Sequence, residues 1–177
     1  RFSQATGNLS GVDRSLANSA AILSHKQSHA EWVRPGIMLY GADPLPTAND
    51  LSSQLRPVMQ LQSHVIAARA IEAGEGVGYN ETWRSHRRSR IGTIAFGYAD
   101  GYPRHARNGT PVVVDGKAVP LVGRVSMDMI TVDLTDHPSA GVGSTALLWG
   151  DGLPAERVAE HADTIPYQLF PSAVWDA

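Results

Sequence analysis

The sequence predicts a mainly β protein, in which an antiparallel β-domain follows two short parallel strands. Three observations support this fold class. Strand-like runs recur between turn signals over residues 58–149. The dipeptide Asp115-Gly116 separates two valine-containing runs and is typical of a hairpin turn. Two earlier apolar segments, residues 15–23 and 32–40, instead suit strands of a parallel sheet.

The first 43 residues contain few elements. Residues 1–6 resemble the end of a helix that Gly7 closes, so we expect the chain to begin inside an element. Residues 15–23 and 32–40 are separated by a polar stretch, and neither is amphipathic along its whole length. This pattern is typical of buried parallel strands, each followed by a short helical turn.

The character of the chain changes near Asp43. A loop rich in turn-forming residues follows, with Pro44, Pro46 and Asn49, so we expect residues 1–43 and 44–177 to form separate domains. In the second part, short apolar runs between turn signals predict an antiparallel sheet. The predicted strands are residues 58–71, 90–97, 110–114, 118–122, 129–134 and 145–149.

Two local features of the second domain can be predicted in detail. Asp115-Gly116 suits a type I′ turn, because both central positions of that turn need a positive φ. Residues 154–161 predict a short helix that begins near Pro154 and exposes Glu156, Arg157 and Glu160.

Composition narrows the function classes. The chain has 177 residues, 42% apolar and 18% charged, with a net charge of −2, so we expect no nucleic-acid partner. It has no cysteine, which excludes disulfides and thiolate metal sites, and His25 and His29 lack the glutamate of a zinc-protease motif, so we expect no metal. No signal peptide or membrane span is recognisable, and we expect a soluble cytoplasmic protein without membrane partners.

Four blocks of sequence carry the most specific information. They are WVRPGIMLYG at residues 32–41, GY at 78–79, GYADGYPR at 97–104 and GRVSMDM at 123–129. Together they closely resemble the C-terminal part of bacterial alanine racemase, over residues 15–167. The resemblance implies a pyridoxal-phosphate enzyme in which a C-terminal β-barrel-like domain follows an α/β barrel of the TIM type. Because a complete barrel needs roughly 250 residues, we expect only the last barrel elements here.

The resemblance assigns residues to the cofactor. Ser19, Gly36 and Ile37 match positions that bind its phosphate, and Tyr167 matches a phosphate-contacting tyrosine. Arg34 matches the arginine that faces the pyridine nitrogen. An arginine only donates hydrogen bonds, so the ring nitrogen opposite it stays unprotonated. Taken alone, Ser19 is more typical of a helix cap, Gly36 of a turn and Arg34 of a surface beside a proline.

Three further residues match the substrate side of the family's site. Tyr79 matches the second catalytic base of the family. A second base is needed because racemisation removes a proton from one face of the α-carbon and returns one to the other face. The backbone around Met127 matches the part of the family's site that contacts the substrate carboxylate, and Tyr98 matches a residue that narrows the entry near it. The alternatives are packing roles: an aromatic ring over a glycine turn for Tyr79 and a core-filling side chain for Met127.

The family also implies an assembly. In that family the active sites form between the two subunits of a head-to-tail homodimer. The enzyme interconverts L-alanine and D-alanine, and the D-alanine is used in peptidoglycan. The cofactor forms a Schiff base with a lysine, but Lys26 and Lys117, the only lysines here, lie outside any such motif. We therefore expect a truncated racemase that is inactive alone. The alternatives are a noncatalytic binding or assembly module and a racemase of serine, lysine or several amino acids.

Overall fold

The structure is a computed structural model that describes residues 2–8 and 10–172. The chain divides into two compact units, Arg1–Arg56 and Pro57–Ala177, which are described separately below. Within the described residues, no helix has the length and apolar character that crossing a lipid bilayer requires.

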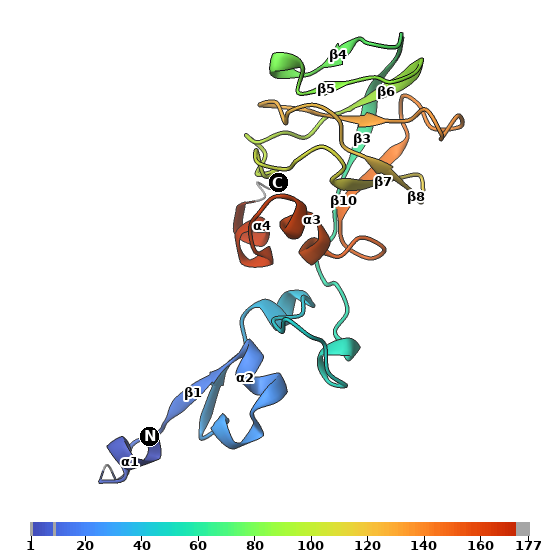
Figure 1. The fold of residues 1–177 in the computed structure, drawn as a ribbon. Helices are drawn as coiled ribbons and strands as arrows, with labels where there is room; N and C mark the ends of the chain where they lie inside the picture. Colours follow the sequence, from blue (N-terminus) through green and yellow to red (C-terminus); the bar gives the residue numbers. More distant parts are fainter. Residues whose placement is uncertain (1, 9, 173–177) are drawn as a thin grey trace. The chain divides into compact units, whose positions relative to one another are not determined.

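The first unit is built around one pair of parallel strands (Figure 1). Strand β1 (Ser15–Asn18) leads directly into helix α2 (Ser19–Ser24), and β2 (Trp32–Arg34) leads into the 3-10 helix η2 (Ile37–Tyr40). This order confirms the prediction of parallel strands followed by helical turns. The remaining elements are α1 (Phe2–Thr6), η1 (Lys26–Ser28) and η3 (Ser52–Gln54).

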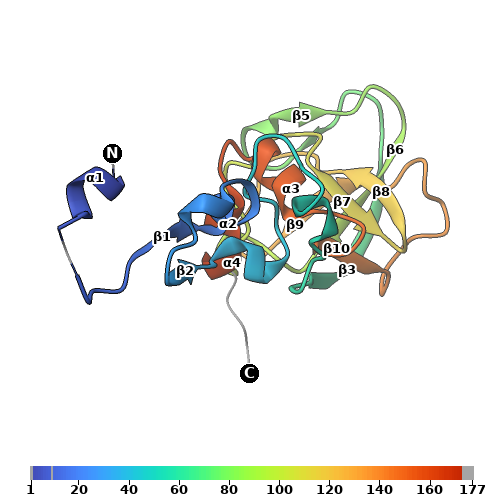
Figure 2. The same cartoon turned by 90° about the horizontal axis from the view of Figure 1, so that it is seen from below.

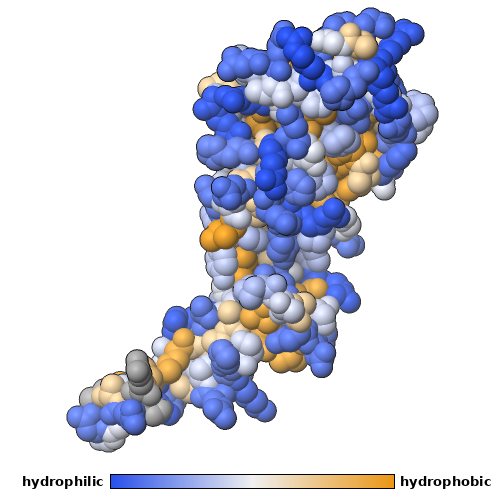
Figure 3. Space-filling model, in the orientation of Figure 1, coloured by the Kyte–Doolittle hydropathy of each residue, from blue (hydrophilic) through white to orange (hydrophobic). Residues whose placement is uncertain are grey.

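One expectation for these strands is wrong. All three residues of β2 are exposed, and Trp32 retains 62% of its accessible surface. A two-stranded sheet has too little neighbouring chain to cover both of its faces. Figure 3 accordingly shows hydrophobic residues on the surface of this unit.

Polar contacts hold the first unit together at two places. The guanidinium of Arg14 donates to the carboxylate of Glu31 at 2.7 and 3.0 Å, and this bond lowers the pKa of Glu31 to about 2. The loop after residue 43 also folds back onto this unit. Asn49 Nδ2 donates to the Leu23 carbonyl at 3.0 Å, and Ser52 Oγ donates to Asp43 at 2.7 Å. The compact unit therefore extends to Arg56.

The second unit is an antiparallel six-stranded sheet in the order β8-β7-β10-β3-β6-β9. Neighbouring strands such as β3 and β10 lie side by side in both views (Figures 1 and 2). The six strands are β3 (Leu61–Ile71), β6 (Ser89–Ile94), β7 (Pro111–Val114), β8 (Lys117–Pro120), β9 (Ile130–Asp133) and β10 (Thr145–Trp149).

The sheet closes on itself almost completely. Just beyond β8, Leu121 forms a bridge with Val132 of β9, and the N–H of Val122 donates to the Thr131 carbonyl at 2.8 Å. Alternate residues of the strands point into a shared core; Val65, Ile94, Val112, Val132 and Leu148 retain at most 1% of their surface. The predicted antiparallel, barrel-like β-domain is thus confirmed.

Local predictions in the second unit also hold, except that Glu156 is half-buried rather than exposed. Asp115 and Gly116 have φ values of 44° and 80°, as a type I′ turn requires, and helix α3 (Ala155–His161) follows Pro154. Sequence reasoning missed the short pair β4 (Gly76–Val77) and β5 (Trp83–Arg84), and helix α4 (Pro166–Ser172). It also missed the 3-10 helix η4 (Tyr79–Glu81) between the paired strands.

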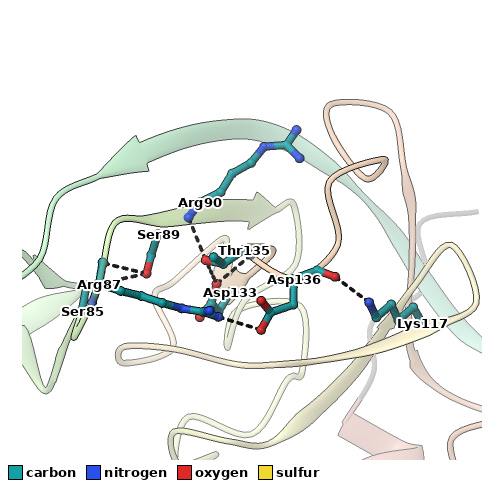
Figure 4. Close-up of polar contacts among 8 residues, drawn as sticks. All are labelled: Ser85, Arg87, Ser89, Arg90, Lys117, Asp133, Thr135 and Asp136. Atoms are coloured by element: carbon teal, nitrogen blue, oxygen red, sulfur yellow. Dashed lines mark hydrogen bonds and ion pairs between the residues drawn. The ribbon is translucent and has the colours of Figure 1, made fainter.

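A polar network anchors the loop that follows β9 (Figure 4). Thr135 Oγ1 accepts from the N–H of Arg90 at 2.9 Å and donates to Asp133. Arg87 pairs with the carboxylate of Asp136 at 2.6 Å, and Lys117 donates to the Asp136 carbonyl. A backbone N–H of β6, the side chain of Arg87 just before β6 and the side chain of Lys117 in β8 thereby fix one loop without any regular structure of its own.

Candidate active site

In the first unit, Ser19 brings two loop segments together. Its side chain is buried, and its Oγ accepts from the N–H of Gly36 at 2.8 Å and from the N–H of Met38 at 3.4 Å. Ser19 begins α2, where the side chain of Asn18 accepts from the N–H of Ala21. Because its oxygen accepts both of these bonds, the Ser19 hydroxyl still has its own proton to donate, and an anion can accept it.

Gly36 and Ile37 lie in the same turn. A Cβ added to Gly36 would meet only Ser19 Oγ, at 3.7 Å, so a ligand could approach this backbone closely. Ile37 is buried and fixes the start of η2. Three of the residues predicted to bind a phosphate, Ser19, Gly36 and Ile37, are thus neighbours in space.

Arg34 is the last residue of β2, and its guanidinium reaches across to β1. Nη1 donates to the carbonyl and to Oγ of Ser15, both at 2.9 Å, and Nη2 donates to the Leu16 carbonyl at 3.3 Å. These bonds hold the planar guanidinium in a fixed orientation at an exposed position.

In the second unit, Tyr79 stands on a strained turn at the end of β4. Gly78, before Tyr79, has a φ of 75°, and Asn80 and Glu81, after Tyr79, have φ values of 58° and 46°. Positive φ at two non-glycine residues costs energy that the surrounding contacts must offset. The turn leaves Tyr79 66% exposed.

Two glycines hold this turn against the segment 123–129. A Cβ on Gly78 would lie 2.8 Å from the N of Arg124, and a Cβ on Gly123 would lie 2.8 Å from the carbonyl oxygen of Val77. Neither position has room for a side chain. The backbone that carries Tyr79 is therefore packed directly against the backbone that leads to Met127.

Tyr98 occupies a second turn that packs on the same segment. Its N–H donates to the Ser126 carbonyl at 3.0 Å, and the N–H of Ala99 donates to the Met127 carbonyl at 2.9 Å. Within the turn, the carboxylate of Asp100 accepts from the N–H of Gly97 at 2.7 Å. Backbone bonds thus tie the Tyr98 turn directly to the segment that contains Met127, and the Asp100 carboxylate supports the turn.

The ring of Tyr98 also has a cationic neighbour. The guanidinium carbon of Arg104 lies 5.3 Å from the ring centroid, within the range of a cation–π contact. Tyr102, at the base of the same turn, is buried against Phe96 and Trp149, and burial raises its pKa far above the ordinary value. Tyr102 is therefore a packing residue that holds the turn and stays protonated.

Two cavities adjoin these turns. One, of about 390 Å³, is lined by the cationic side chains of Arg104, Arg107 and Arg124 and gives the surface next to the Tyr79 turn a positive field. The other, of about 220 Å³, lies between Tyr98 and helix α4. Tyr167 is on α4 and is 48% exposed, but it is not among the residues that line either cavity.

Contacts within the second unit thus bring three predicted residues onto one segment. The turns of Tyr79 and Tyr98 both pack against residues 123–129, which include Met127. Sequence reasoning missed Arg104, although it lies inside the GYADGYPR block, and Asn108, for which no motif gives a signal. Asn108 joins the two loops through its side chain, as described below.

Comparison with known proteins identifies the family of this chain. Residues 58–173 match the family model described as alanine racemase, C-terminal domain, and residues 1–44 match alanine racemase, N-terminal domain. The alanine racemase of Chromohalobacter salexigens is 60% identical over 155 residues, which are 88% of this chain and 43% of that protein. That of Aeromonas hydrophila is 55% identical over 169 residues, 96% of this chain and 47% of that protein.

Solved structures show the same relationship. The biosynthetic alanine racemase of Pseudomonas aeruginosa has a TM-score of 0.92 and 48% identity, covering 96% of this chain and 48% of that one. The alanine racemase of Bartonella henselae with covalently bound pyridoxal phosphate has a TM-score of 0.87 and 36% identity, covering 98% and 48%. The chain spans less than half the length of these relatives. The family models, the similar sequences and the shared fold together show that this chain belongs to the alanine racemase family.

Proposed function

We propose that this chain is the C-terminal portion of a cytoplasmic, pyridoxal-phosphate-dependent racemase that interconverts L-alanine and D-alanine. The observation that carries the proposal is the packing of the Tyr79 and Tyr98 turns on the single segment that contains Met127. We also propose that residues 1–43 are the barrel remnant and residues 44–177 the C-terminal β-domain of the family, with the loop over residues 44–56 packed on the first unit.

The first unit supplies groups that suit the cofactor. The Ser19 hydroxyl, oriented by the N–H groups of Gly36 and Met38 that donate to it, would donate to the phosphate, with the open backbone at Gly36 allowing close approach and Ile37 fixing the turn. Arg34 would donate to the ring nitrogen and keep it unprotonated, while Tyr167 would add a hydroxyl to the phosphate. When bound, pyridoxal phosphate would withdraw electrons from the α-carbon and acidify its proton.

The second unit would supply the groups on the substrate side. Tyr79 would hold or accept the α-proton on one face of the substrate, since two bases on opposite faces suit racemisation better than one. Tyr98 and the backbone at Met127 would confine the amino acid. The three arginines of the larger cavity give this surface the charge that a substrate carboxylate prefers.

The exposure of these residues supports a shared site. Tyr79, Tyr98 and Met127 retain 66%, 38% and 53% of their surface, although backbone contacts hold the turns on which they stand. In a head-to-tail homodimer they would act on the cofactor of the partner subunit. The residues of the first unit and Tyr167 would hold the cofactor of their own chain.

The test needs a complete barrel. We define the barrel-completed protein as this chain preceded by the part of the Chromohalobacter racemase that lies on the N-terminal side of the match. With pyridoxal phosphate it should interconvert the alanine enantiomers and elute as a dimer, whereas the chain alone should be inactive. Turnover of serine or lysine in preference to alanine would change the substrate, and no racemisation by a folded, cofactor-loaded dimer would favour a binding or assembly module.

A further inference from the structure

Asn108 joins two loops that belong to the candidate site. Its Nδ2 donates to the Thr82 carbonyl at 3.0 Å, and its Oδ1 accepts from the N–H of Gly123 at 2.7 Å. Thr82 closes the 3-10 helix that begins at Tyr79, and Gly123 begins the segment that leads to Met127. One side-chain amide therefore uses its donor on one loop and its acceptor on the other.

This double contact lies beside the tightest packing of the two loops. Gly78 and Gly123 meet without room for a side chain, and the intervening turn holds Asn80 and Glu81 at positive φ. A strained turn relaxes unless its neighbours hold it in place. The β4 and β5 strands that flank the turn have two residues each, so their own hydrogen bonds offer little resistance.

We propose that Asn108 is a positioning residue for the racemase reaction, because its amide ties the turn that carries Tyr79 to the loop that leads to Met127. The inference rests on the proposed function and adds to it a residue that acts through the turn that carries Tyr79. Without the amide, the Tyr79 turn would move relative to Met127. The six-stranded sheet would stay folded, since neither loop contributes a strand to it.

The chain itself gives the first test, by amide hydrogen exchange. Asn108→Leu removes both contacts at nearly constant volume, and Asn108→Asp keeps the acceptor for Gly123 but loses the donor to Thr82. The Gly123 amide should exchange about fivefold faster in Asn108→Leu, as expected for one lost hydrogen bond, and remain protected in Asn108→Asp. Exchange in β3 and β6 should not change.

The matched control is Thr135→Val. Thr135 Oγ1 also secures a loop to a backbone N–H, that of Arg90, but in the network of Figure 4 rather than at the candidate site. This variant should leave the Gly123 amide unchanged. It also measures how far the loss of a loop anchor by itself affects stability.

The second test follows the α-proton in the barrel-completed protein. The measured rate is the exchange of the α-proton of each alanine enantiomer for deuterium in deuterium oxide. For the enantiomer that Tyr79 serves, Asn108→Leu should lower the kcat of this exchange about tenfold and change KM little. The reason is that a displaced acid/base group slows proton transfer more than it weakens binding. Exchange from the other enantiomer should fall far less. Thr135→Val should affect both enantiomers equally and weakly.

The outcomes separate the two proposals. An unchanged Gly123 amide in Asn108→Leu, or equal loss of exchange from both enantiomers, would overturn the positioning role. If the barrel-completed wild type neither exchanges nor racemises alanine, the proposed function fails instead, and the amide exchange alone then decides whether Asn108 holds the two loops together.

Discussion

Gly97 and Met127 are in direct backbone contact. A Cβ on Gly97 would lie 2.2 Å from the Met127 carbonyl oxygen and 2.5 Å from the N of Met129. This approach allows the N–H groups of Tyr98 and Ala99 to bond the segment 126–127. The absence of a side chain at position 97 therefore sets the distance between two residues of the candidate site.

We expect Gly97→Ala to destabilise the second unit by about 3 kcal/mol, because the new methyl group meets backbone atoms that cannot rotate away. Urea unfolding followed by circular dichroism measures the change. Gly141→Ala is the control, since its nearest atom is the flexible Arg90 guanidinium at 3.1 Å, and it should cost under about 1 kcal/mol. Equal stability losses in the two variants would show that the 97–127 contact is not tight.

Tyr79→Phe tests the proposed base. In the barrel-completed protein, solvent-deuterium exchange into one enantiomer should fall by about 10²-fold or more, the range for a positioned acid/base group. Exchange into the other enantiomer should survive better. Net racemisation must fall equally in both directions at kcat/KM, because a catalyst does not move the equilibrium.

The same variant tests the origin of the site. Mixed with a protein that lacks the cofactor lysine, Tyr79→Phe should regain activity, because one site of a mixed dimer then contains both bases. The absence of rescue, despite mass-spectrometric proof that the subunits mix, would place both bases on one chain.

Ser19→Ala removes the acceptor shared by Gly36 and Met38. Because Ser19 is buried, we expect the first unit of the barrel-completed protein to lose about 1–2 kcal/mol and its pyridoxal-phosphate affinity to fall about tenfold. Thermal unfolding and equilibrium dialysis measure the two effects. Ser24→Ala, on the same helix but exposed, should change neither quantity by a comparable amount; a matching loss would remove Ser19 from the phosphate site.

The chain alone should not acquire pyridoxal phosphate covalently. Neither Lys26 nor Lys117 lies in the family's lysine motif, and Lys117 Nζ donates to the Asp136 carbonyl. Borohydride reduction followed by peptide mapping should therefore yield only substoichiometric, scattered labelling. One modified lysine per chain would contradict this expectation.

The pairing of Arg14 with Glu31 predicts a pH effect in the first unit. The folded pKa of Glu31 is about 2, against an ordinary value of 4.5, so the pair stabilises the fold above about 4.5 and loses this effect as the pH falls through 2. A carbon-13 titration of the Glu31 carboxyl should show the low midpoint, and Arg14→Met should return it toward the ordinary value. A midpoint that ignores Arg14→Met would mean that the pair does not form in solution.

Local sequence signals determined much of this protein. The Asp115-Gly116 hairpin, the helix after Pro154 and most strands of the sheet could be predicted, because turn chemistry and apolar runs act over a few neighbouring residues. The four motif blocks also singled out Tyr79, Tyr98 and Met127 by resemblance. Their roles remain predictions that the experiments above test.

Only the tertiary structure decided how these pieces meet. The six-stranded sheet of the second unit closes through the bridge between Leu121 and Val132. Asn108 forms hydrogen bonds with Thr82 and Gly123, which lie 26 and 15 residues away along the chain. The exposure of β2 also depends on which chain segments cover it. Such contacts depend on the geometry of the closed sheet. The secondary-structure propensities and the spacing of residues that are neighbours in sequence do not predict which distant backbone segments will be in contact.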